Sequence, residues 1–160
     1  MHPRMALISM LAVVSVAACG GKANPSGAGA GGARPGSDGS AASLYDRLGK
    51  RDAIAAVVKD FVEERVAKDN RINAFFLNTD IPAFEATLVD QICQASGGPC
   101  TYTGKDMKTS HAGMKIRDAD FTALVEDLKA SLDHFQVDAA SQQDLIGALA
   151  AMHDDIVTAK

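Results

Sequence analysis

The apolar side chains after residue 43 recur every three or four positions, which is the period of a helix with one buried face. The clearest run begins at residue 50 and carries six apolar residues on one predicted face: Ile54, Val57, Val58, Phe61, Val62 and Val66. Alternating patterns typical of strands are weak throughout the chain. The sequence therefore predicts one all-α domain over residues 43–160, long enough for a single core.

Polar and turn residues mark where these helices begin and end. Ser43 is a predicted cap for a short helix that stops at Gly49, and Asp80 before Ile81-Pro82 predicts the start of a longer one. Gly97-Gly98-Pro99 should end that helix, because Gly accepts a left-handed cap and Pro blocks continuation. Further helices are expected over residues 105–114, 118–135 and 139–157.

The N-terminal segment has the pattern of an export signal. Arg4 precedes an uncharged stretch over residues 5–18, which is too short to span a bilayer. Val-Ala-Ala-Cys at residues 16–19 resembles a bacterial lipobox, in which Cys19 would carry the lipid anchor. The alternative is a plain signal peptide with Cys19 incidental. We expect residues 1–18 to be a signal peptide and the mature protein to be a membrane-anchored lipoprotein of the bacterial cell envelope.

The segment after Cys19 has the composition of a linker. Residues 20–42 are dominated by Gly, Ala, Ser and Pro and hold no apolar side chain larger than Ala. Residues 19–42 are therefore predicted to form a lipidated cysteine and a flexible tether. The whole chain has a formal net charge of −4, with both signs interspersed. Because no basic stripe is present, a nucleic-acid partner is not expected.

Cys93 and Cys100 form an even pair once Cys19 is assigned to the lipid. In an oxidising compartment such a pair favours a structural disulfide, with a redox switch as the alternative. The bridge would close a loop of about 8 residues and contribute roughly 2.5 kcal/mol. A zinc site is disfavoured because the sequence has no CxxC motif or His/Cys cluster.

Histidines are the candidate ligands outside the cysteines. His134 lies at a predicted helix end, where a solvated imidazole suits the helix dipole. His111 shares a helical face with Met107 and Met114, and it lies in a short segment between two breaks. His153 lies on the apolar face of the last predicted helix. The residues alone leave His111 and His153 as rivals, each either a ligand or an ordinary core residue.

The ordered set of motifs around these residues resembles group I of the truncated haemoglobins. The matching stretches are LYDRLG (44–49), RINAFF (71–76), GGP (97–99), YTGKDMKTSHAGM (102–114) and the helix from Asp118. Together they cover essentially all of residues 43–157. The resemblance implies a two-over-two helical sandwich around a non-covalent haem b. It also implies reversible binding of a diatomic gas, O₂, NO or CO.

The family pattern assigns roles to individual positions. It makes His111 the proximal ligand of the haem iron, and His153 then becomes a core or haem-edge residue. The implied haem contacts are Phe75, Phe76, Phe84, Leu88, Met107 and Ile116. The implied distal pocket, on the gas side of the haem, consists of Val62, Phe84, Leu88 and Gln91.

This chain departs from the family on the gas side. Group I members commonly carry Tyr after the Phe of their second helix, whereas this chain has Val62 after Phe61. The segment is one residue longer than usual, and a slip by one would put Glu63 there. Thr87 and Gln91 are the remaining polar candidates. Loss of a hydrogen bond worth roughly 1.5–3 kcal/mol predicts weaker oxygen binding.

The sequence is compatible with three functions. The leading one is a gas-binding haem protein whose ferrous iron is five-coordinate, because no distal histidine is available. The second is an NO dioxygenase on the same haem, which would need a reductase partner. The third is a haem-free, lipid-anchored helical binding module in which His111 is an ordinary core residue.

Overall fold

The computed structural model describes residues 42–159, and all regular structure in that range is helical. The elements are α1 (Leu44–Arg47), α2 (Lys50–Lys59), η1 (Asp60–Arg65), η2 (Val66–Lys68), η3 (Asn73–Phe76), α3 (Ile81–Ala95), α4 (Met107–His111), α5 (Asp118–His134), α6 (Ala139–Ala150) and α7 (His153–Ile156). The all-α prediction is confirmed. The predicted signal peptide, Cys19 and nearly all of the predicted tether lie outside the described residues. No helix within them is long and apolar enough to cross a bilayer.

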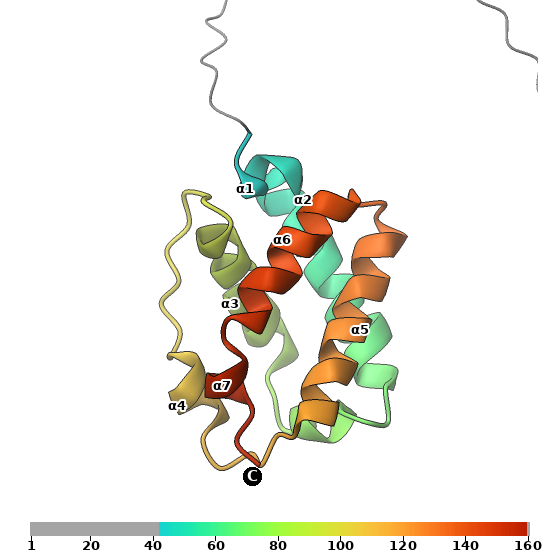
Figure 1. Cartoon of the computed structure of the whole chain (residues 1–160), viewed down its shortest axis with the longest axis vertical. Coiled ribbons are helices and arrows are strands. Elements are labelled where there is room, and N and C mark those ends of the chain that lie inside the picture. The colour runs from blue at the N-terminus through green and yellow to red at the C-terminus, as the bar shows by residue number, and fades with distance from the viewer. Residues whose placement is uncertain (1–41, 160) are drawn as a thin grey trace, which may run out of the picture. The chain divides into compact units, whose positions relative to one another are not determined.

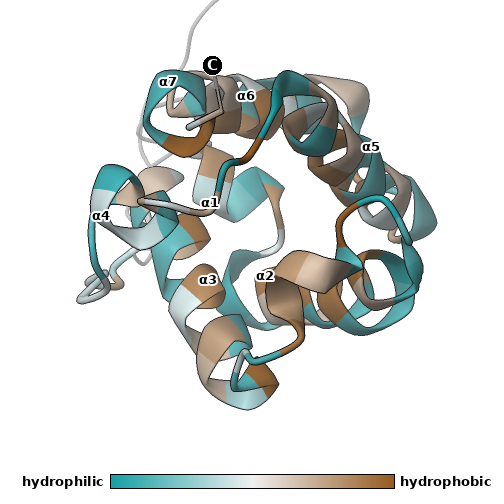
Figure 2. Cartoon of the chain, turned by 90° about the horizontal axis from the view of Figure 1, so that it is seen from below, coloured by the Kyte–Doolittle hydropathy of each residue, from teal (hydrophilic) through white to brown (hydrophobic). Residues whose placement is uncertain are grey.

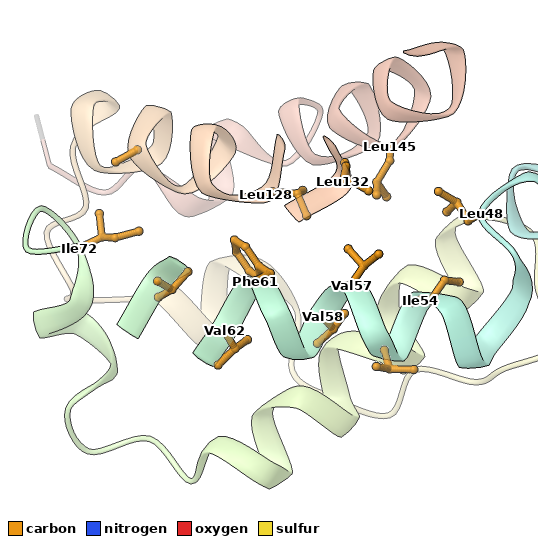
Figure 3. Packing of buried hydrophobic residues seen from close by; sticks show 13 residues of the cluster. Leu48, Ile54, Val57, Val58, Phe61, Val62, Ile72, Leu128, Leu132 and Leu145 are labelled. Atoms are coloured by element: carbon orange, nitrogen blue, oxygen red, sulfur yellow. The ribbon is translucent and has the colours of Figure 1, made fainter. Parts of the chain in front are cut away.

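Two groups of helices pack face to face (Figure 1). In one group α2 packs along α3, and in the other α5 contacts α6. η1, which continues α2, packs against α5. The main core lies between these groups, where Val57 and Phe61 face Leu128 and Leu145 (Figure 3). The short helices α4 and α7 contact each other, and α4 is mostly hydrophilic (Figure 2). α4 is therefore held in part by its contacts with α7, which lies far from it in the sequence.

Side-chain caps fix where the helices start. Asp80, Asp106 and Asp138 each accept a hydrogen bond from a backbone N–H in the first turn of α3, α4 and α6, at 3.1, 2.8 and 3.0 Å. The predicted Ser43 cap is present as well, with its Oγ 3.1 Å from a backbone nitrogen three residues on. Gly49 joins α1 to α2 with a φ of 81°, which Gly adopts readily.

The long helix predicted over residues 50–66 changes its geometry part-way. The α-helix ends at Lys59, a π-helix continues to Arg65, and a 3₁₀ turn ends at Lys68. All six apolar residues of the predicted face are nevertheless buried: Ile54, Val57, Val58, Phe61, Val62 and Val66. A π turn holds more residues than an α turn. The apolar residues therefore stay buried. After Lys59, however, their side chains point in directions other than those of a regular α-helix.

Two further helices are shorter than their patterns predict. The segment 105–114 is helical only over Met107–His111, because Gly113 continues the chain in a turn with a φ of 79°. The predicted terminal helix breaks after Ala150 and resumes as α7. The backbone N–H groups of Thr158 and Ala159 then both donate to the Ile116 carbonyl, at 2.9 and 2.8 Å. This break lets the chain end close over the segment between α4 and α5.

A disulfide joins Cys93 on α3 to Cys100 in the following loop. Cys93 is completely buried, so the bond ties the loop that leads into α4 to the end of α3. Gly98 lies against this bond, and a Cβ added there would lie 2.6 Å from the Tyr45 ring and 2.7 Å from Cys93 Sγ. Only glycine fits at this position. The Cys93–Cys100 pairing is the one that the sequence predicts.

We expect replacement of both cysteines by serine to lower the free energy of unfolding by about 2.5 kcal/mol, because an eight-residue loop loses its covalent closure. Urea denaturation of the full chain measures this difference. Reducing agent should destabilise the wild type by a similar amount and leave the double serine variant unchanged. Equal stabilities of the wild type and the variant would contradict a structural role for this bond.

Stability should also fall on acidification. Hydrogen bonds and ion pairs hold the pKa of six carboxyls below the usual value: Asp60, Asp69, Asp106, Asp120, Asp133 and Asp138. The pKa of Asp127 is raised instead, chiefly by burial and further by the charge of Asp69. A lowered folded-state pKa stabilises the fold at pH values above the unfolded pKa, near 4. This stabilisation is lost as the pH falls from there through the lower folded-state pKa. Urea midpoints measured from pH 7 to pH 3 should decrease; constant or rising midpoints would refute this.

Candidate functional site

A cavity of about 400 Å³ lies between the helices. Its wall is contributed by Phe61 of η1, Phe75 and Phe76 of η3, Phe84, Leu88 and Gln91 of α3, Met107 and His111 of α4, Phe121, Leu124 and Leu128 of α5, Leu145 and Leu149 of α6, and Ile156 of α7, among others. The wall is predominantly apolar. Its size is within the range of small-molecule and cofactor sites.

His111 is oriented as a ligand in this wall. Its Nδ1 lies 2.7 Å from the Met107 carbonyl oxygen. Because a carbonyl oxygen only accepts hydrogen bonds, Nδ1 donates to it, and in a neutral imidazole this leaves the lone pair on Nε2. A backbone carbonyl that fixes the tautomer and ring orientation in this way is a common support for metal-binding imidazoles. The Asp106 cap at the start of α4 holds the turn that bears both groups.

His153 is engaged elsewhere. Its Nε2 lies 3.0 Å from Asp118 Oδ1 and its Nδ1 lies 3.0 Å from Asp154 Oδ1. These two carboxylates, Asp154 foremost, raise the pKa of His153. Its ring stands edge-on to Phe121, with centroids 4.9 Å apart, and it is absent from the cavity wall. The structure therefore separates the two rivals, because only His111 faces the cavity.

Most of the predicted site residues are brought together. Phe75, Phe76, Phe84, Leu88, Gln91, Met107, His111 and Ile116 all line the cavity. Phe76 and Phe84 stack at a tilt with ring centroids 5.6 Å apart, which joins the η3 corner to α3. Met114 and Thr87 also contribute to the wall. The predicted residues thus form one continuous surface, although they come from four separate segments.

Val62 differs from its predicted place in the distal pocket. It is 2% exposed and lies in the core, whereas its neighbour Phe61 lines the cavity. Glu63, the alternative under a one-residue slip, is exposed. The physical reason is the π-helix η1, which begins one residue before Phe61 and changes the direction of the side chains that follow.

Two hydroxyl groups of the wall are already hydrogen-bonded to backbone carbonyls within four residues. Thr87 Oγ1 donates to a backbone carbonyl one turn earlier at 2.8 Å, and Tyr102 Oη donates to the Lys105 carbonyl at 2.6 Å. Gln91 Nε2 is placed against two methionine sulfurs, at 3.4 and 3.8 Å. Thioether sulfur is a weak acceptor. Gln91 is therefore the wall residue whose amide can most easily turn to a new partner.

Sequence reasoning missed much of the wall, including Phe61, Tyr102 and Lys105. The Tyr102 ring occupies the space beside Gly104, where an added Cβ would lie 2.4 Å from it. This close approach explains the glycine in the motif YTG. A glycine two residues after a tyrosine could therefore have indicated that the Tyr102 ring packs against this turn. Nothing in the local sequence separates Phe61 from Val62, since both belong to the same apolar face.

The described residues contain no cluster of three or more His, Cys, Asp or Glu side chains that could hold a metal ion. His111 is the histidine that lines the apolar cavity. A metal at this position would need its other ligands from a cofactor.

Comparison with known proteins decides the family. The model of the bacterial-like globin family matches residues 43–158. A group 1 truncated haemoglobin of Mycolicibacterium paratuberculosis is 32% identical over 117 residues, which cover 73% of this chain and 85% of the relative. The chain belongs to the group 1 truncated haemoglobins. A relative from Tetrahymena pyriformis is 35% identical over 95 residues, covering 59% of this globin and 78% of the relative.

Solved structures agree with this assignment. Truncated haemoglobin from Tetrahymena pyriformis in the Fe(III) form superposes with a TM-score of 0.69 at 30% identity, over 72% of this globin and 98% of the other chain. The 2/2 haemoglobin from Synechococcus sp. PCC 7002 gives 0.68 at 27% identity over the same shares, 72% and 98%. The predicted two-over-two sandwich is therefore confirmed. Members of this family are haem-binding globins.

Proposed function

We propose that this globin binds haem b non-covalently in the cavity, with His111 as the proximal iron ligand, and that it reversibly binds a diatomic gas. The observation that carries the proposal is His111 itself, whose Nδ1 is tied to the Met107 carbonyl at 2.7 Å while the ring lines the cavity. A haem held by one imidazole offers an open axial position to O₂, NO or CO. A neutral imidazole nitrogen suits iron.

The remaining wall supports this use. Phe75, Phe76, Phe84 and Leu88 provide aromatic and aliphatic surface from η3 and α3, and Met107 and Ile116 provide it beside His111. Together these side chains would pack against the two faces of a flat apolar ring. The same packing would exclude water from the faces of the ring. No charged group has to be desolvated to fill this part of the cavity.

The gas side is dominated by side chains that cannot donate a hydrogen bond. Phe61, Phe84 and Leu88 line it, and the hydroxyl of Thr87 is already used by the backbone. Oxygen depends on such a donor more than CO or NO, so we propose that this pocket releases oxygen readily. Gln91 is the residue able to supply a weaker contact. His153 is held by two carboxylates, so a five-coordinate ferrous iron is proposed.

We also propose that this globin is held in the bacterial cell envelope by a lipid on Cys19. The lipobox-like residues 16–19 and the Gly/Ala/Ser/Pro tether support this proposal. A tether of roughly 25 Å average span would keep the gas-binding domain close to the membrane.

Titration of the purified chain with haemin tests the function. We expect one equivalent to give a sharp Soret band, whose intensity and position change strongly in His111→Ala because the iron loses its axial nitrogen. The matched control His153→Ala should keep the wild-type band, since His153 lies outside the cavity wall. A wild-type chain that stays colourless after desalting would refute the proposal and favour a haem-free binding module. An unchanged band in His111→Ala would refute the assignment of His111.

A further inference from the structure

A buried carboxylate lies at the start of the π-helix. Asp60 is the first residue of η1 and is 9% exposed, although it belongs to a residue type that is rarely buried without partners. Neither the cavity nor His111 involves it. π-helical turns are uncommon and often occur beside functional sites. Asp60 directly precedes Phe61, the η1 residue that lines the cavity.

Three donors converge on this carboxylate. Within η1, Arg65 Nε lies 3.2 Å from Asp60 Oδ2. From α5, Ser131 Oγ donates to Oδ2 at 2.7 Å and His134 Nδ1 lies 2.9 Å from Oδ1. Ser131 is completely buried. His134 is solvated at the end of α5, as the sequence predicts, with its side chain 58% exposed. The structure adds a contact with Asp60 that the sequence did not predict.

The spacing of these contacts matches the π geometry. Asp60 and Arg65 are five residues apart, which is the hydrogen-bonding interval of a π-helix; an α-helix uses four. The pair therefore joins the first and last residues of η1 across its widened turn. Ser131 and His134 are three apart on α5 and so share one face of that helix. The Asp60 carboxylate thus links the two ends of η1 and also joins η1 to α5.

Two neighbouring residues of η1 differ in whether they face the cavity. Phe61 and Val62 point to opposite sides of the chain, and Phe61 points toward Leu128 of α5 (Figure 3). Phe61 and Leu128 both line the cavity, whereas Val62 does not. A turn with α geometry would rotate the residues after Lys59 relative to α5. The side chain presented to the gas side therefore depends on the π turn.

We propose that Asp60 is a positioning residue: by clamping η1 to α5 through Arg65, Ser131 and His134, it sets Phe61 as the gas-facing side chain. The gas-binding part of this inference rests on the proposed function. The positioning part concerns the chain alone and can be tested without haem. A contact that merely stabilised the fold would leave the placement of Phe61 unchanged wherever the variant folds.

The first test is structural. In the wild-type chain without haem, we expect nuclear Overhauser contacts between the Phe61 ring and the Leu128 methyl groups, and slow amide exchange over residues 60–65. Asp60→Ala should weaken these contacts and speed exchange in η1 by at least about tenfold, the equivalent of 1.4 kcal/mol. Asp60→Asn keeps an acceptor oxygen and should restore much of both signals. The control Asp133→Ala removes a carboxylate near the end of α5 that contacts Lys129 and Gln142, and it should leave both signals unchanged.

The second test uses the haem-loaded chain. A hydroxyl added by Phe61→Tyr should slow oxygen dissociation in the wild-type background, and this effect should fall to less than about threefold in the Asp60→Ala background. Ser131→Ala, which keeps two of the three donors, provides a milder variant and should give the same changes at smaller size. Unaltered Phe61 contacts and a full tyrosine effect in folded Asp60→Ala or Ser131→Ala would overturn the proposal. Failure to bind haem would refute the proposed function and leave the structural test intact.

Discussion

Phe61→Tyr should slow the dissociation of oxygen from the haem-loaded globin by a factor of about 10 to 100. Phe61 lines the cavity, and Phe84 and Leu88 on the proposed gas side carry no hydrogen-bond donor. A phenol hydroxyl there can donate to oxygen, which gains negative charge when it binds. A hydrogen bond to a charged acceptor is worth roughly 1.5–3 kcal/mol. Stopped-flow mixing with an oxygen scavenger measures the rate directly.

Val62→Tyr is the matched control for this substitution. Val62 is 2% exposed in the core and absent from the cavity wall. A phenol there should overpack the core at a cost of about 1–3 kcal/mol and leave oxygen dissociation nearly unchanged. CO dissociation should change little in either variant, because CO depends less on a donor. Slower oxygen release in Val62→Tyr with none in Phe61→Tyr would show that η1 presents Val62 to the gas.

His111→Gly should lower haem affinity by a factor of at least about 100, since replacing even a supporting partner of a metal ligand costs 10–100-fold. The glycine leaves a gap where the imidazole lay beside Met107. Millimolar imidazole added to the solution should enter this gap, bind the iron and restore the wild-type absorption spectrum. Haem transfer to an excess of apomyoglobin measures the affinity loss, with and without imidazole.

The controls for this prediction lie on the same chain. His153→Gly should behave as wild type in haem transfer, because both ring nitrogens of His153 already face Asp118 and Asp154. Added imidazole should change its haem transfer no more than it changes that of the wild type. Haem retention in His111→Gly equal to that of the wild type without imidazole would show that another group holds the iron.

Much of the fold follows from local patterns. The helical period of apolar residues gives the buried faces of α2, α3 and α5, and Asp80, Asp106 and Asp138 cap their helices through contacts within three residues. The disulfide partners follow from the even pair of cysteines. Such features depend on residues that are close in sequence, so a single chain is enough to predict them.

The rest depends on contacts between distant segments. The apolar pattern of η1 would suit an α-helix as well as the observed π-helix. The buried carboxylate of Asp60 accepts a hydrogen bond from Ser131, which lies 71 residues later in the chain. His111 and His153 both follow apolar patterns. In the structure His153 is paired with its chain neighbour Asp154 and with Asp118, which lies 35 residues earlier. Periodicity cannot reveal such a partner, which is why it left the two histidines as rivals. It placed Val62 correctly on a buried face; the family pattern was what put Val62 in the distal pocket.

The most direct test of the account is the iron–histidine stretching mode in the resonance Raman spectrum of the ferrous, ligand-free globin. We predict a single such mode from a five-coordinate, high-spin iron. It should shift when histidine is labelled with ¹⁵N, disappear in His111→Gly, and persist in His153→Gly. A six-coordinate low-spin spectrum without added ligand, or a mode that survives in His111→Gly, would contradict the assignment of His111 as the proximal ligand.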